Sequence, residues 1–187
     1  AGPLGNFGLD DSTNTILCIG GGSGISAIKA LVEKACRLQV KRDCLFFYGA
    51  RTQADLYCEP ELMEIRNLWH RDHKFIFVQV LSGEDDESEW SGARGQVVDY
   101  IENNFSSLNM PAWSDISGFL CGPGPMVNAG RSLLERKGVS KNQIYADVFE
   151  DASSPAPTVD NSKCVLCDEC LLVKPIENCI IEASGSF

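Results

Sequence analysis

Basic residues are scarce in this chain of 187 residues. It has 16 Lys and Arg against 26 Asp and Glu, only two His, and a net charge of −10 at pH 7. This charge repels phosphate backbones and anionic headgroups, which excludes a nucleic-acid-binding protein or a membrane-surface protein. It leaves open a basic protein partner for an acidic face.

Long apolar runs are also absent. The longest fall well short of the roughly 20 residues that span a bilayer, so no membrane insertion is expected. No signal peptide is visible at the start, and no internal repeat is present. The chain begins with Ala1 rather than Met, so we expect an excised or processed piece. Five scattered cysteines are typical of reduced, buried thiols in a cytoplasmic protein: Cys18, Cys36, Cys44, Cys58 and Cys121.

A glycine-rich turn at residues 20–24 separates a predicted strand from a predicted helix. Residues 16–19 form an apolar run typical of a strand buried on both faces, and good helix formers begin at Ala27. Gly22, Gly24 and Ala27 fit the pattern G-x-G-x-x-A. In that pattern glycine permits a sharp turn and the approach of a diphosphate to the helix N-terminus. The pattern alone also fits an ordinary tight turn between a strand and a helix.

One feature of the standard dinucleotide fold is missing. That fold places an acidic residue about 20 positions further on, at the end of the second strand. Here the second strand ends in Tyr48-Gly49-Ala50-Arg51. A dinucleotide site in this chain therefore differs from the standard Rossmann form.

Strands and helices are expected to alternate along the chain. The predicted strands are 16–19, 44–48, 74–81, 115–121 and 144–149. The predicted helices are 27–38, 60–69, 95–103 and 126–137. This order predicts an α/β fold with a five-stranded, parallel, doubly wound sheet. Glycine-rich turns directly follow the first and the fourth strand, so we expect both turns at one carboxyl edge of the sheet, forming one ligand site.

Four motifs occur in order along this predicted domain. They are Gly21-Gly22-Ser23-Gly24-Ile25, Tyr48-Gly49-Ala50-Arg51-Thr52 with Asp55-Leu56-Tyr57, Ser82 with Trp90-Ser91-Gly92-Ala93-Arg94-Gly95, and Cys121-Gly122-Pro123-Gly124-Pro125-Met126. As a set they resemble the pyridine-nucleotide-binding domain of the ferredoxin–NADP reductase superfamily, and most closely the NADH-using reductase components of bacterial oxygenases. The resemblance covers about residues 2–150, and residues 2–7 resemble the end of that family's flavin-binding barrel.

The resemblance implies a role for each motif. The glycine loop faces the diphosphate, Ser23 lies near the nicotinamide, and the Cys121 side chain lies beside the nicotinamide C4 as the catalytic residue. A buried strand-end thiol is the alternative interpretation of Cys121. Arg51 alone would suggest the 2′-phosphate of NADPH, whereas the surrounding motif favours NADH. The implied cofactor-binding residues are Gly21, Gly22, Ser23, Gly24, Ile25, Arg51, Thr52, Gly122, Pro123 and Met126.

The family's reaction is hydride transfer from the nicotinamide to FAD or FMN, followed by electron transfer to an iron–sulfur centre. The chain departs from the family by Ala27, where proline is frequent, and by the lack of a flavin barrel and of an Arg-x-Tyr-Ser motif. We therefore expect an NADH-binding module of a flavoprotein oxidoreductase. Its flavin would lie in a missing domain or a partner subunit, and its electron acceptor would be an oxygenase or a ferredoxin.

Four cysteines crowd the end of the chain. The predicted organisation is a flavin-domain connector at 1–9, the nucleotide-binding domain at 10–151, a Ser- and Pro-containing linker at 152–163 and a cysteine-rich tail at 164–187. Four thiolates suit an iron–sulfur cluster or a tetrahedral zinc site, although the spacing matches no standard cluster motif. In a redox module we favour iron–sulfur over zinc and over unligated or disulfide-linked thiols. The candidate ligands are Cys164, Cys167, Cys170 and Cys179.

Three other functions fit parts of this pattern. A terminal cluster would resemble the electron-transfer subunit of dihydroorotate dehydrogenase. A non-catalytic nucleotide sensor would use the same glycine loop with a structural zinc tail. A plain α/β interaction domain would require the ordered motifs to be accidental.

Overall fold

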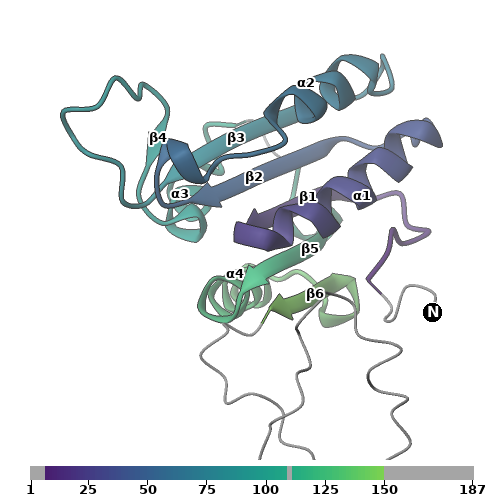
Figure 1. Cartoon of the computed structure of the whole chain (residues 1–187). Helices are drawn as coiled ribbons and strands as arrows, with labels where there is room; N and C mark the ends of the chain where they lie inside the picture. The colour runs from purple at the N-terminus through teal and green to yellow at the C-terminus, as the bar shows by residue number, and fades with distance from the viewer. Residues whose placement is uncertain (1–6, 109–110, 150–187) are drawn as a thin grey trace, which may run out of the picture. The chain divides into compact units, whose positions relative to one another are not determined.

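Six parallel strands form one sheet in a computed structural model that describes residues 7–108 and 111–149 (Figure 1). The strand order is β4-β3-β2-β1-β5-β6. The strands are β1 (Thr15–Gly21), β2 (Cys44–Ala50), β3 (Phe75–Leu81), β4 (Ala93–Arg94), β5 (Ile116–Pro123) and β6 (Ile144–Phe149). The predicted α/β class and parallel sheet are confirmed. The predicted linker and cysteine-rich tail lie outside the described residues.

The prediction of five strands is wrong by one. The additional strand, β4, pairs only Ala93 with Val80 and Arg94 with Leu81. Two residues are too short to show the apolar alternation from which a strand is recognised. Three other strands extend beyond their predicted ends, and β2 continues through Gly49 and Ala50. β1 continues through Gly20 and Gly21, which the sequence predicted as the turn, and β5 continues through Pro123.

Helices cover both faces of the sheet. α1 (Ile25–Arg37) and α2 (Glu59–Leu68) pack on one face, and α3 (Val97–Asn104) and α4 (Gly124–Arg136) pack on the other (Figure 1). β1 shows why its sequence is apolar throughout. Ile16 and Cys18 join the core under α1, whereas Leu17 and Ile19 join the core under α4. Each fully buried large side chain contributes about 1.5–3 kcal/mol relative to an exposed one.

The chain reverses direction across the sheet at β1. It runs outward from β1 through β2 and β3 to β4, then returns to place β5 on the other side of β1. In doubly wound sheets this reversal leaves a crevice at the carboxyl ends of the two central strands, where ligands bind. Within the described residues no helix is long and apolar enough to cross a membrane.

A buried ion pair fixes the segment that precedes β1. The Arg42 guanidinium donates to Asp10 Oδ1 at 2.7 Å, and the two side chains are only 5% and 9% exposed. Ser117 Oγ donates to the other carboxylate oxygen of Asp10 at 2.7 Å. Arg42 also donates to the Asn14 carbonyl, and its own carbonyl accepts from the Trp69 indole at 3.0 Å. This cluster joins residues 10–14 to the start of β5 and to the end of α2.

Burial opposes ionisation of Asp10, but hydrogen bonds from Ser12, Ser117 and Arg42 outweigh it and lower the pKa of the carboxyl below its ordinary 3.8. A carboxyl with a lowered pKa stabilises the fold above its unfolded-state pKa. That contribution is lost as the pH falls through the lower, folded-state pKa. The acid side of the stability curve therefore depends on this cluster.

Asp10→Asn is expected to reduce the free energy of unfolding at pH 7 by about 3 kcal/mol, because it leaves Arg42 buried without its counter-charge. Denaturant titrations at several pH values would measure this. They should show a flatter acid limb for the variant below about pH 4. Asp11→Asn, at the exposed neighbouring position, is the control and should change neither quantity. Equal stability of the two variants would contradict this account of the cluster.

Candidate nucleotide-binding site

A cavity of about 750 Å³ opens at the carboxyl ends of the central strands. Its size is in the range of sites for small molecules and cofactors. Its walls come from the ends of β1, β2, β3 and β5 and from the first turns of α3 and α4. Five of the predicted cofactor residues line it: Gly21, Gly22, Arg51, Pro123 and Met126.

The glycine loop forms a short 3-10 turn, η1 (Gly22–Gly24), between β1 and α1. Gly22 is exposed and has φ +52°, a conformation that other residues rarely adopt, and a Cβ there would meet nothing within 4 Å. Gly24 is buried for a different reason. A Cβ on Gly24 would lie 2.3 Å from the Cys121 carbonyl oxygen. Gly24 is therefore required for packing of the loop against β5, a reason that differs from the predicted approach of a diphosphate.

The two glycine-rich turns meet at one edge, as predicted. Gly20 of β1 is in register with Cys121 of β5, so the turns leave adjacent strands at the same level. Gly122 has φ +148°, and a Cβ there would lie 2.7 Å from the Gly21 carbonyl oxygen. Met126 packs over the same place, since a Cβ on Gly21 would lie 2.7 Å from its sulfur. Backbone from both turns is thus in close contact.

Cys121 lies behind this contact. Its side chain is fully buried in the core on the α1 face and does not line the cavity. Burial, reinforced by the charge of Asp147, raises the pKa of the Cys121 thiol to about 12. The thiol is therefore neutral at pH 7 and is a poor nucleophile. Asp147 is directly opposite Cys121 in the register of β5 and β6, and the sequence analysis did not single it out.

The remaining predicted residues divide into exposed and buried positions. Ser23 is exposed on the glycine loop, and Thr52 is half-buried at the start of the loop after β2. Ile25 and Gly122 are buried, and Ile25 belongs to the core under α1. These two residues shape the loop from behind and do not line the cavity.

Arg51 marks the other end of the cavity. Its side chain is 84% exposed, and its Nε lies 3.8 Å from Asp55 Oδ2. The same carboxylate oxygen accepts hydrogen bonds from the Thr52 hydroxyl and backbone N–H, both at 3.0 Å. These bonds lower the pKa of Asp55, which is therefore ionised at neutral pH. The loop after β2 thus presents a cation that is already paired with an anion.

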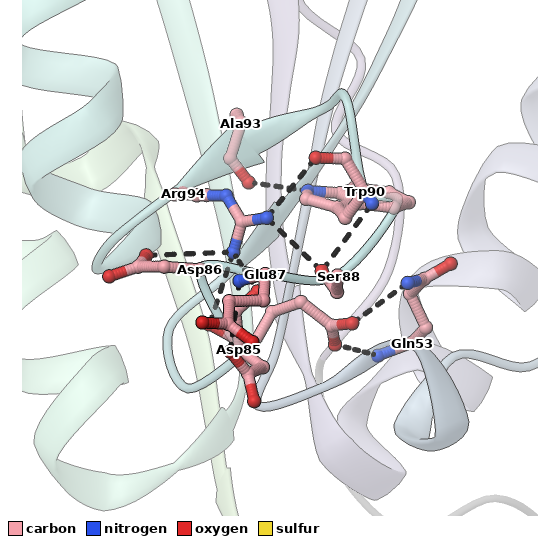
Figure 2. A network of polar contacts seen from close by, with 9 residues as sticks. Gln53, Asp85, Asp86, Glu87, Ser88, Trp90, Ala93 and Arg94 are labelled. Carbon is pink, nitrogen blue, oxygen red and sulfur yellow. Dashed lines mark hydrogen bonds and ion pairs between the residues drawn. The ribbon is translucent and has the colours of Figure 1, made fainter.

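A second carboxylate reaches this loop from the segment between β3 and β4. Glu84 accepts hydrogen bonds from the backbone and the side-chain amide of Gln53, both at 2.8 Å. Hydrogen bonding by Gln53 lowers the pKa of Glu84. The Arg94 guanidinium holds the segment in place, because it donates to the carbonyls of Glu84, Asp85 and Trp90 and to the Ser88 hydroxyl (Figure 2).

The sequence analysis did not predict this network. The only local signal is Arg94, a single cation that follows five acidic residues within eleven positions.

The packing role of Gly49 was not predicted from the sequence either. A Cβ on Gly49 would lie 2.9 Å from Val97 Cγ1, so glycine there allows α3 to approach the cavity.

In the described part of the chain, no group of three or more His, Cys, Asp or Glu side chains is arranged to hold a metal ion. His70 and His73 pack edge to face in a turn, with His73 3.1 Å from Asp43. The four tail cysteines lie outside the described residues.

Comparison with known proteins agrees with this geometry. The family model for the oxidoreductase NAD-binding domain matches residues 18–132. The electron transfer component XylA of xylene/toluene monooxygenase from Pseudomonas putida is 38% identical over 147 residues, which are 79% of this chain and 40% of that protein. The reductase component of propane 2-monooxygenase from Mycolicibacterium goodii is 35% identical over 153 residues, which are 79% of this chain and 41% of that protein.

Reductases of solved structure are similar to this chain as well. The Amycolatopsis cytochrome P450 reductase GcoB superposes with a TM-score of 0.68 at 33% identity, over 81% of this chain and 44% of that one. The ferredoxin reductase in carbazole 1,9a-dioxygenase superposes with a TM-score of 0.59 at 28% identity, over 75% and 39%. The chain thus spans about 40% of the length of the curated relatives it matches. It belongs to the oxidoreductase NAD-binding domain family, as its glycine loop and sheet topology indicate.

Proposed function

We propose that this chain binds NADH and presents its nicotinamide to a flavin held by another domain or subunit. The observation that carries the proposal is the meeting of two glycine-rich turns at the switch point of the sheet, beside a cavity of about 750 Å³. Reduced nicotinamide, when bound, supplies a hydride, so the work of the protein is to bind and orient it.

The residues present fit a dinucleotide diphosphate. α1 begins at Ile25, and its first N–H groups have no partner within the helix. These groups and the positive end of the helix dipole favour an anion. Gly22 precedes these groups in the chain and has no side chain that would obstruct a phosphate. The loop carries no acidic residue that would repel a phosphate.

Cys121 would act by orientation and not as a nucleophile. Its thiol is neutral and packs in the core with Ile25, and its carbonyl lies against Gly24, so Cys121 would support the glycine loop from behind. Pro123, which lines the cavity, would form the floor under the nicotinamide, and Gly122 would support it from behind. Asp147, opposite Cys121 on β6, is a second positioning candidate.

The adenosine end favours NADH over NADPH. Arg51 is the cation that a 2′-phosphate would need, but Asp55 already pairs with it. Glu84 brings a second negative charge to the same loop through Gln53. A 2′-phosphate would meet like charges there, whereas a 2′-hydroxyl would meet hydrogen-bond acceptors.

A calorimetric titration of the chain with NADH and NADPH would test the proposal and this preference. NADH is expected to bind more tightly. The double variant Asp55→Asn/Glu84→Gln is expected to narrow the ratio of the two dissociation constants by about tenfold, since it removes the like-charge repulsion. Glu87→Gln, an exposed acidic residue of the same segment, is the control. If neither NADH nor NADPH binds to the wild-type chain, the proposed function is contradicted.

Cys121→Ala is expected to slow flavin reduction more than tenfold in a reductase assembled with its flavin domain, while NADH affinity stays within about tenfold. Orientation of the reacting atoms affects the barrier more than it affects binding. Single-turnover stopped-flow kinetics would measure this. Cys44→Ala, at an equally buried cysteine at the start of β2, is the control for packing loss. Unchanged single-turnover rates in Cys121→Ala would remove Cys121 from the mechanism.

The electrons would pass on to an oxygenase-type or ferredoxin-type partner. Supporting this, the relatives are by name an electron transfer component of a monooxygenase and a reductase component of another. The net charge of −10 suits a partner with a basic docking face.

We propose that the four tail cysteines bind an iron–sulfur cluster. Four thiolates within residues 164–179 are the donor set that such clusters use. Anaerobic purification followed by iron, sulfide and zinc assays and a visible spectrum would test this. Iron and sulfide in a cluster ratio, lost on Cys167→Ser, are expected. Stoichiometric zinc without sulfide would instead support the structural tail of a nucleotide sensor.

A further inference from the structure

Tyr57 reaches the glycine loop from a distant part of the chain. It lies between the 3-10 turn η2 (Gln53–Asp55) and α2, and its hydroxyl donates to the Gly22 carbonyl oxygen at 2.5 Å. Tyr57 is 37% exposed, so it lies at the surface. Its hydrogen bond joins the loop after β2 to the glycine loop. Tyr57 is not among the residues that line the cavity. A direct role in lining the ligand site therefore does not explain it.

The buried Tyr48 fixes the position of Tyr57. The Tyr57 backbone N–H donates to the Tyr48 hydroxyl at 3.2 Å, and that hydroxyl donates to the Asp55 carbonyl at 3.3 Å. The two rings pack edge to face, with centroids 6.1 Å apart. Burial raises the pKa of Tyr48 to about 12, so its hydroxyl stays protonated and can donate at neutral pH. Tyr57 is thus held on a rigid support at the end of β2.

The bond from Tyr57 determines the orientation of one peptide group. The Gly22–Ser23 peptide is trans and planar, so its carbonyl and its N–H point in opposite directions. The carbonyl points to Tyr57 and also accepts the Ile25 N–H. The Ser23 N–H must then point away from Tyr57, where an anion at the start of α1 would lie.

The orientation of the Gly22–Ser23 peptide is not fixed by the backbone itself, because Gly22 is a glycine. Gly22 has φ +52°, and glycine adopts positive and negative φ about equally readily. Without a second bond to its carbonyl, the peptide could rotate and direct the carbonyl oxygen, an acceptor, at the bound phosphate. The Tyr57 hydroxyl is the interaction outside the loop that opposes this rotation.

We propose that Tyr57 is a positioning residue that holds the Gly22–Ser23 peptide with its N–H directed at the diphosphate of the nucleotide. This inference rests on the proposed function, because it needs a diphosphate at the glycine loop. It also links the two ends of the site. Asp55, which pairs with Arg51, and Tyr57, which holds Gly22, are two residues apart and share Tyr48 as their support.

The test compares wild type, Tyr57→Phe and Tyr145→Phe as full chains. Tyr57→Phe keeps the ring that packs on Tyr48 and removes only the hydroxyl. Tyr145→Phe removes a hydroxyl from a ring that stacks on Phe119 and does not line the cavity. NADH affinity would be measured by calorimetry, thermal unfolding by calorimetry, and the Ser23 amide by 15N–1H correlation spectra of the NADH-free chains.

Tyr57→Phe is expected to weaken NADH binding about tenfold and to shift the Ser23 amide resonance, with little change in the unfolding midpoint. Tyr145→Phe is expected to match wild type in affinity and in the Ser23 resonance. Wild-type affinity in Tyr57→Phe, or weakened binding with an unshifted Ser23 amide, would overturn the inference. In either case the proposed function would stand if wild type binds NADH. The proposed function itself would be contradicted only if the wild-type chain does not bind NADH.

Discussion

The close contact between the glycine loop and the end of β5 is the constraint on which the rest of the site depends. Neither side of this contact has room for a side chain, since a Cβ on Gly24 would lie 2.3 Å from the Cys121 carbonyl oxygen and one on Gly122 would lie 2.7 Å from that of Gly21. Because β1 and β5 are neighbours at the switch point, the contact determines where α1 begins. It therefore also determines the direction of the first N–H groups of that helix, and Gly21 and Gly22 before it line the cavity.

The two ends of the cavity are built from different interactions, which suits different tasks. The end at the glycine loop is close-packed over a buried core at Gly24 and Gly122, and such packing allows little movement at these two positions. The proposed hydride transfer would need such fixed geometry at that end. The other end, where we propose that the adenosine binds, is held by exposed ion pairs and hydrogen bonds around Arg51, Gln53 and Arg94, each of which contributes little to stability. In the proposed function, charges there would select among nucleotides without disturbing the end that holds the nicotinamide.

Much of this site could be predicted from the sequence, for physical reasons. Buried parallel strands are continuous apolar runs, and turns that follow such strands must share an edge, so the alternation in the sequence predicted both the sheet and the meeting of the two turns. Strand β4 was not predicted, because its two residues are too few to show a periodic pattern. The packing reason for Gly24 and the contacts of Tyr57 and Glu84 could not be predicted, because they join positions far apart in the chain, such as Tyr57 and Gly22. Spacing along a sequence does not encode such contacts.

The measurement that tests the central claim most directly is a map of backbone amide shifts as NADH is added to the 15N-labelled chain. The account predicts that the shifts concentrate at the glycine loop, the end of β2, the start of α3 and the turn after β5, which surround the cavity. It predicts no shifts around Asp10 and Arg42, whose ion pair lies near the amino ends of the strands. Saturable shifts centred on any other surface, or no shifts at millimolar NADH, would contradict it.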